Sequence, residues 1–394
     1  MYWISENSSF YDIINETNNI KISWSKNIFN DQLNLSRYYF DSAYEICKEI
    51  LDDNINDNVK YDMWFLPCVY LFRQSIELLI KAGLSKTIRF KPKLQSEFIK
   101  SKHNLKLLFD SYTNNVEQIQ LSNEELFWIK KYLESIENID ANSDLFRYPF
   151  KDDFLSQYKN DFLDIVSMAN RLIQCYSILN KSIFGHKYED EEIDLTYIPE
   201  FLSFATHGFG NCYLWDSPWG DGFHKQVIGY SETGKYLFEK FKQCKKVAYV
   251  YPMIFLFRNA IELALKRLMY VQAKHQISEY QINKIKNTHL LYKDLWSSIK
   301  PVLGYYAEKS GQDIHQIEIA EKYIDEINLI DKNGDMFRYP FSYSFEYKFN
   351  NKLINIENVY IYFQSIFNFL NGCDNWLDEI SDFEREMYSY YDCY

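Results

Sequence analysis

The sequence predicts an all-α protein made of two related helical bundles. One stretch occurs twice, because LFRQSIELLIK at 71–81 recurs as LFRNAIELALK at 256–266, 185 positions later. A proline lies four residues before each copy, at Pro67 and Pro252. Apolar residues recur at three- and four-residue steps, which is the period of an amphipathic helix. Further matched blocks follow in the same order in both halves, which indicates an internal duplication.

The first half of the chain divides into a short leading segment and a first bundle. Residues 1–35 are polar and are expected to cap the bundle, with IKISW alternating like a short strand. The first bundle is assigned to residues 36–183, with a basic, irregular connection at 91–102. Ser122 and Glu125 form a capping-box pattern. The predicted helices cover residues 36–53, 62–84, 103–112, 122–138 and 161–179.

The second bundle, residues 227–380, repeats this order. Between the bundles, residues 184–226 form a linker that is first acidic and then rich in glycine and tryptophan. The tail, residues 381–394, is acidic and aromatic, and we expect it either to be disordered or to dock on a partner. The predicted helices of this half cover residues 227–243, 252–271, 289–296, 313–329 and 358–380.

Composition predicts a cytoplasmic globular protein. The net charge of −12 excludes a general attraction to nucleic acid, so an RNA site would need a local basic patch. Seven cysteines without a CxxC pair are typical of a reduced compartment. The N-terminus lacks a signal-peptide pattern, and the longest apolar runs are about half the length of a membrane span. We therefore expect no membrane association.

Known site motifs are missing from the sequence. The histidines and cysteines show no zinc spacing, and no P-loop, GxSxG or HExxH motif occurs. We therefore expect neither a metal nor a cofactor.

Each copy of the repeated helix carries a row of charge. Positions four apart lie on one face of a helix, so Arg73, Glu77 and Lys81 should form a ladder. One interpretation is an internal ion-pair network in which Arg147 also reaches Glu77. The other is a polar cleft that binds a phosphate or a ribose hydroxyl. The second half offers the same alternatives through four equivalent residues: Arg258, Glu262, Lys266 and Arg338.

Two histidines occur at matched predicted helix starts, His103 and His289. Each could cap its helix or bond a carboxylate, and each could act as a general acid or base.

An FRYPF block occurs in both halves, at 146–150 and 337–341. Its arginine, Arg147 or Arg338, is expected to pair with the aspartate three residues earlier or with the central glutamate of the ladder. Those aspartates are Asp144 and Asp335.

Basic residues cluster beside both histidines. This cluster is either a solvated loop or the place where RNA would bind. It comprises Arg89, Lys91, Lys93, Lys100, Lys102 and Lys106 in the first half, and Lys284, Lys286 and Lys293 in the second.

The order FR[QN]xIELxxK, then HxLxxL, then DxxRYP, resembles the HEPN superfamily of bacterial toxin–antitoxin and phage-defence proteins. The resemblance covers about 36–180 and 227–380. It implies two tandem HEPN-like bundles paired about a pseudo-two-fold axis, and many members are metal-independent ribonucleases. Active members carry Arg and, four to six residues later, His on one helix. Arg73-Gln74 and Arg258-Asn259 match its first two positions, but the histidine is missing here.

Two functions follow from this resemblance. In the first, the chain belongs to a bacterial defence or toxin-type system and binds or cleaves RNA at a cleft between the halves. Its tentative catalytic residues are Arg73, His103, Arg258 and His289, and its binding residues are Gln74, Asn259, Arg147, Tyr148, Arg338 and Tyr339. In the second, the chain is a non-enzymatic adaptor for a partner protein, and these residues are structural. Either form could also assemble as a homo-oligomer.

Overall fold

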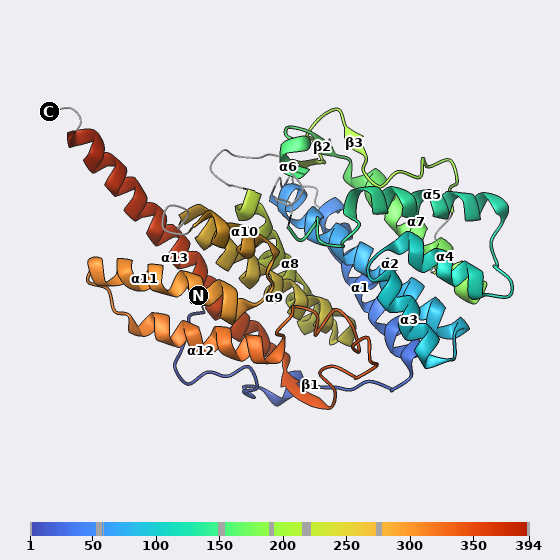
Figure 1. Ribbon diagram of the computed structural model, residues 1–394, viewed down its shortest axis with the longest axis horizontal. Coiled ribbons are helices and arrows are strands. Elements are labelled where there is room, and N and C mark those ends of the chain that lie inside the picture. The colour runs from blue at the N-terminus through green and yellow to red at the C-terminus, as the bar shows by residue number, and fades with distance from the viewer. Residues whose placement is uncertain are drawn as a thin grey trace.

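The computed structural model confirms an all-α protein, with about 67% of the structure in helices and little sheet. The N-terminal half, blue to green in Figure 1, lies beside the C-terminal half, yellow to red. The structure describes residues 2–52, 57, 59–148, 154–188, 193–214, 222–272 and 278–391.

The first half is built on two long neighbouring helices, α1 and α2, with shorter helices on one side of α2 (Figure 1). A π-helical turn at Lys60–Trp64 leads into α2. The elements in order are β1 (Asn19–Ile22), α1 (Ile28–Leu51), α2 (Phe65–Thr87), α3 (Lys91–Ser101), α4 (Leu105–Asn115), α5 (Asn123–Asp140), α6 (Phe154–Gln157), β2 (Phe162–Leu163) and α7 (Ile165–Phe184).

The second half has a similar central pair, α8 and α9. It ends in the long helix α13, which extends away from the body of the molecule (Figure 1). The elements in order are β3 (Phe204–Ala205), β4 (Cys212–Tyr213), α8 (Gly222–Cys244), α9 (Val250–Arg267), α10 (Glu279–Asn287), a π-helical segment (Leu291–Trp296), α11 (Ser297–Lys309), α12 (His315–Ile330), β5 (Lys352–Asn355) and α13 (Ile356–Tyr391).

Three sequence-based expectations about the helices were wrong. First, α1 begins at Ile28 rather than near residue 36, because the Asn27 side chain caps it by accepting from the Asn30 N–H. Second, the connection expected to be irregular is the helix α3, which has a proline in its first turn. Third, the last helix, α13, does not end near residue 380 but continues through the tail as far as Tyr391, so the tail is not disordered over these residues, and its docking on a partner stays a prediction.

One further segment also differs from expectation. The helix α11, which carries Pro301 in its interior, was not predicted. The acidic part of the linker, at 189–192, lies outside the described residues, as does part of its Gly/Trp-rich stretch. The capping box of Ser122 and Glu125 is confirmed at the start of α5.

The strand leading into each half pairs with the opposite half. β1, which precedes α1, pairs antiparallel with β5 of the second half. In the other direction β4, which precedes α8, pairs antiparallel with β2 of the first half. The Trp24 indole also donates to the Lys348 carbonyl at 2.7 Å. The leading segment therefore packs on the second half.

An aromatic cluster joins the two halves at the centre. Tyr70 on α2 stacks against Phe255 on α9, with ring centroids 5.0 Å apart. Tyr39 from α1 and Tyr230 from α8 contact the same Phe255 ring. All four rings are buried, so this contact is part of one continuous core.

Two helical stretches, Lys60–Thr87 and Val247–Val271, are long and apolar enough to span a membrane. In both, 94% of the most apolar window is buried inside the protein.

Candidate functional site

The charged row of α2 forms a buried ion-pair ladder. Arg73 Nη1 donates to Glu77 Oε2 at 2.8 Å, and Lys81 Nζ donates to Glu77 Oε1 at 2.6 Å. Arg73 and Glu77 are wholly buried. Burial alone would raise the pKa of Glu77, but the charges of Lys81, His103 and Arg73 outweigh it and hold this pKa well below its ordinary value.

The row on α9 makes the same contacts. Arg258 Nη1 donates to Glu262, and Lys266 Nζ lies 2.9 Å from Glu262 Oε1. The pKa of Glu262 is also well below its ordinary value, because the surrounding cations outweigh the effect of burial. Both carboxylates are therefore charged and act as the centres of their clusters.

The ladder arginine of the first half is fully occupied. Arg73 Nη2 donates to the His103 carbonyl at 2.8 Å, and Arg73 Nε lies 3.2 Å from Asp140 Oδ2. The other oxygen of Asp140 accepts from the backbone N–H groups of Asp144 and Leu145 at 2.9 and 3.0 Å. Asp140 therefore ties the ladder to the loop that follows α5.

The same loop anchor occurs in the second half. Arg258 Nη2 donates to the His289 carbonyl at 2.7 Å, and its Nε lies 3.8 Å from Asp331. Asp331 accepts from the N–H of Asp335 at 2.9 Å. Gly334, with φ of 70°, lies against Arg258, and a Cβ there would be 3.2 Å from the guanidinium carbon.

The two aspartates that anchor the loops were missed as site residues. Asp140 and Asp331 each follow an isoleucine and lie at the same spacing before the RYP motif of their half. This shared spacing could have identified them from the sequence. They form ion pairs with the ladder arginines. The sequence had suggested two other aspartates, Asp144 and Asp335, and had suggested them as partners of the RYP arginines.

The histidines contact the central glutamates through one ring nitrogen. His103 Nδ1 lies 3.1 Å from Glu77 Oε1, and His289 Nδ1 lies 2.9 Å from Glu262 Oε1. Neither histidine caps a helix; the Asn104 side chain caps α4. A carboxylate at Nδ1 favours the tautomer with its proton on Nδ1, which leaves Nε2 as a base.

The histidine pKa values are lower than usual. For His103, the charge of Glu77 raises the pKa, but burial and the charges of Lys81 and Arg338 together lower it further. The same balance around Glu262 lowers the pKa of His289. Side-chain exposures of 31% and 33% leave both rings accessible to a ligand. Both rings are therefore poised as neutral, accessible bases at neutral pH.

The tyrosine of each RYP motif crosses to the opposite half. Tyr339 Oη donates to Glu77 Oε1 at 2.9 Å and lies 3.1 Å from His103 Nδ1. In the reciprocal contact, Tyr148 Oη donates to Glu262 and lies 3.1 Å from His289 Nδ1. Each cluster therefore contains residues from both halves.

Tyrosines of the central core hold these loops in place. Tyr39 Oη donates to the Phe337 carbonyl at 3.2 Å, and Tyr230 Oη donates to the Phe146 carbonyl at 3.1 Å. Each bond joins a helix of one half to the RYP loop of the other. Pro149 and Phe150 of the first motif lie outside the described residues.

The RYP arginines also cross the interface, and the pairings expected for them were wrong. Arg147 Nε donates to Asn259 at 3.1 Å, and Arg338 Nη2 reaches the Gln74 oxygen at 3.4 Å. Both guanidiniums lie within about 6 Å of the Phe255 ring. Among the described residues neither forms an ion pair with a carboxylate, because Asp140 and Asp331 are bound to the ladder arginines.

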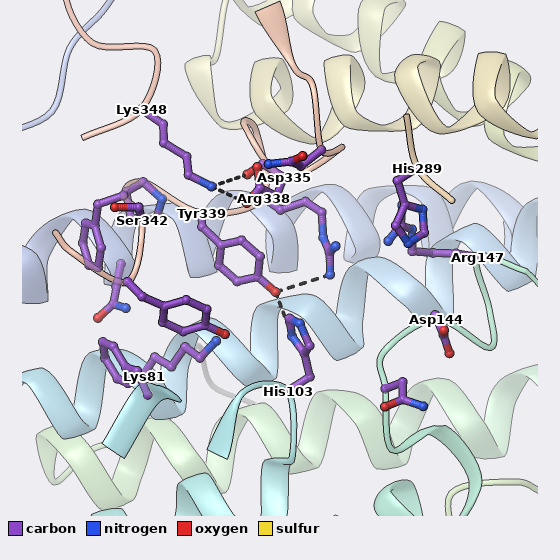
Figure 2. A pocket seen from close by; sticks show the side chains of 17 residues that line it. Lys81, His103, Asp144, Arg147, His289, Asp335, Arg338, Tyr339, Ser342 and Lys348 are labelled. Atoms are coloured by element: carbon purple, nitrogen blue, oxygen red, sulfur yellow. Dashed lines mark hydrogen bonds and ion pairs between the residues drawn. The ribbon is translucent and has the colours of Figure 1, made fainter. Parts of the chain in front are cut away.

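A cavity of about 280 Å³ lies between the halves and contains both histidines. Arg147 and Arg338 lie between His103 and His289 (Figure 2). Lys348 also lines the cavity, and its Nζ forms an ion pair with Asp335 Oδ2 at 2.5 Å. Arg73 and Arg258, expected in such a cleft, do not line it, because their ion pairs keep them buried.

A scan against protein-family models and searches of curated proteins and solved structures gave no match.

The predicted site residues therefore separate into two groups. Arg73, Glu77 and their equivalents form buried frameworks, together with the aspartates that the sequence analysis missed. The histidines and the RYP residues Arg147 and Arg338 reach the cavity. Within the described part of the chain, no group of three or more His, Cys, Asp or Glu side chains could hold a metal ion.

Proposed function

We propose that the chain is a pair of tandem HEPN-like bundles, derived by internal duplication and related by a pseudo-two-fold axis, that binds and cleaves single-stranded RNA at the central cavity. The observation that carries the proposal is a single cavity lined by His103 and His289, from opposite halves, and by Arg147 and Arg338. The order of the motifs resembles that of bacterial defence and toxin-type proteins. We expect the protein to lie in the cytoplasm.

The two arginines supply the reason for an anionic ligand. Arg147 and Arg338 are 3% and 7% exposed, and neither forms an ion pair with a carboxylate among the described residues, although the charges of Glu262 and Glu77 act on them from farther away. Burying an unpaired charge is costly, and an anion bound between the two guanidiniums would offset that cost. Guanidinium groups suit phosphate because they donate two parallel hydrogen bonds.

The histidines supply the chemistry. Nε2 of one neutral histidine would take the proton of a ribose 2′-hydroxyl as its oxygen attacks the adjacent phosphorus. The P–O2′ bond forms and the P–O5′ bond breaks, while the departing 5′-oxygen takes a proton from the other histidine, in the fraction of molecules in which that histidine is protonated. Arg147 and Arg338 would stabilise the negative charge that develops on the phosphate oxygens.

The test uses purified full-length protein with labelled single-stranded RNA, in buffer with a metal chelator. We expect cleavage to 2′,3′-cyclic phosphate ends by the wild type and none by a His103→Gln, His289→Gln double variant. His315→Gln, which changes an exposed histidine on α12, is the matched control. RNA binding should weaken in an Arg147→Gln, Arg338→Gln variant that retains its helical circular dichroism.

The second candidate is a non-enzymatic adaptor for a partner protein. It is favoured by the net charge of −12 and by the wholly buried Arg73, which no ligand can reach. Wild-type protein that neither binds nor cleaves RNA would support the adaptor. Cleavage that is equal in the wild type and the histidine double variant would refute the proposed catalytic pair.

A further inference from the structure

The two ends of the central cavity differ in chemistry. In Figure 2, Lys81 and Ser342 lie on one side of His103, whereas Arg147, Asp144 and His289 lie on the other. The cavity lining also includes aromatic and amide side chains, namely Phe98, Phe341, Tyr343 and Gln32. The cavity therefore combines a cationic part with flat apolar surfaces.

The aromatic surfaces are held by the core. Phe98 and Phe341 are 2% and 6% exposed. Both pack against Phe345, with ring centroids 6.3 and 5.5 Å away. Tyr343 differs because 42% of it is exposed, so its ring is available to a ligand. Phe98 and Phe341, which expose little surface, give the cavity a fixed apolar lining, and Tyr343 is the ring on which a ligand can stack.

The side-chain amide of Gln32 lines the same cavity as these rings. Gln32, on α1, is buried, and its one hydrogen bond within the described ranges joins its side-chain oxygen to Ser85 Oγ at 2.7 Å. The other end of the amide is left to meet a ligand. The free end is the amide NH2, which donates, and every base carries an acceptor on its polar edge, so this group can contact any base.

We infer that the aromatic part of this cavity, formed by Phe98, Phe341, Tyr343 and Gln32, binds one nucleobase of the RNA. The inference rests on the proposed function, which places the neighbouring phosphate at Arg147 and Arg338. A cavity of about 280 Å³ is at the small end for ligand pockets, so it suits a single nucleotide unit and not a duplex. Every base has a π-face, so stacking there binds the ligand without fixing its sequence.

The experiment measures binding of two 2′-O-methyl hexanucleotides to full-length protein. One carries a mixed base sequence, and the other carries the same backbone with abasic sites throughout. The 2′-O-methyl groups block attack on phosphorus, so binding is measured apart from cleavage. The variants are Tyr343→Ala, Tyr343→Phe and a matched control, Tyr280→Ala, which changes an exposed tyrosine on α10.

We expect the base-containing strand to bind about 10-fold more tightly than the abasic strand, and Tyr343→Ala to remove that difference. Tyr343→Phe and Tyr280→Ala should retain it. Equal binding of both strands, lost in an Arg147→Gln, Arg338→Gln variant, would overturn the base site and leave the anion site standing. Binding of neither strand would overturn both. A base preference unchanged in Tyr343→Ala would place the stacking elsewhere and overturn the inference.

Discussion

Tyr339 donates its phenolic hydrogen to Glu77, 262 residues away in the other half, at 2.9 Å. The bond lies at the centre of a cluster in which the carboxylate also meets Arg73, Lys81 and His103. Because Tyr148 makes the reciprocal bond to Glu262, the two halves are joined by the polar residues of both clusters as well as by the aromatic core.

The first prediction tests the contribution of these crossing bonds. Tyr339→Phe should lower the free energy of unfolding by about 1–3 kcal/mol, because a hydrogen bond to a buried charged group is lost. Urea unfolding followed by circular dichroism measures it. Tyr280→Phe, which removes an exposed phenol, should change nothing. A Tyr339→Phe variant as stable as the wild type would mean that the bond contributes no net stability.

The second prediction concerns the central carboxylate itself. Glu77→Gln leaves the buried Arg73 and Lys81 without their shared counter-charge, which should cost about 3–5 kcal/mol of unfolding free energy. Glu232→Gln, which removes an exposed pair with Lys235, is the comparison and should leave stability unchanged. Equal stability of the two variants would show that the ladder is not the structural centre of the bundle.

The third prediction follows from the lowered pKa values of His103 and His289. Between the ordinary histidine pKa of about 6.5 and the lower folded value, the unfolded chain binds protons that the folded protein does not. Stability from these groups is therefore complete above about pH 6.5 and is lost as the pH falls through that window. Urea unfolding at pH 7.5, 6.5 and 5.5 should show the decrease, and a His103→Gln, His289→Gln variant should show less of it.

The fourth prediction concerns Glu137, which lies on α5 near Arg73. Burial raises the pKa of Glu137 to about 7, although its carboxylate accepts from the Leu105 N–H at 3.0 Å. Because the folded pKa is raised, stability from this group is complete below about pH 4.3 and is lost as the pH rises through 7. Glu137→Gln should therefore gain stability over the wild type at pH 8 and not at pH 4. An equal difference at both pH values would contradict the raised pKa.

The helical period of the apolar residues predicted the all-α class. The ladder on α2 follows from four-residue spacing, because that spacing places its side chains on one face of any helix. The contact of His103 with a carboxylate was one of the alternatives open at the sequence level. The many basic residues of 91–102 obscured the apolar pattern of α3. Its buried Leu94 and Phe98 lie four positions apart, on one face of the helix.

The crossing of the RYP motifs could not be predicted. A repeat shows that Arg147 and Arg338 are equivalent, but it does not show which glutamate or amide each one faces. Proximity in sequence favoured Asp144 as the partner of Arg147. In the structure Asp140 accepts from the loop backbone, and Arg147 donates to Asn259 of the other half. The second contact depends on how the two halves pack.

The stack of Tyr70 on Phe255 makes the centre of the interface chemically unequal. A homodimer with exact two-fold symmetry must carry the same residue on both sides of its axis. Here one side of the stack bears a hydroxyl, which contacts Gln74 at 3.2 Å, and the other bears none. The core of the interface therefore cannot be exactly symmetric, however similar the sequences on its two sides are.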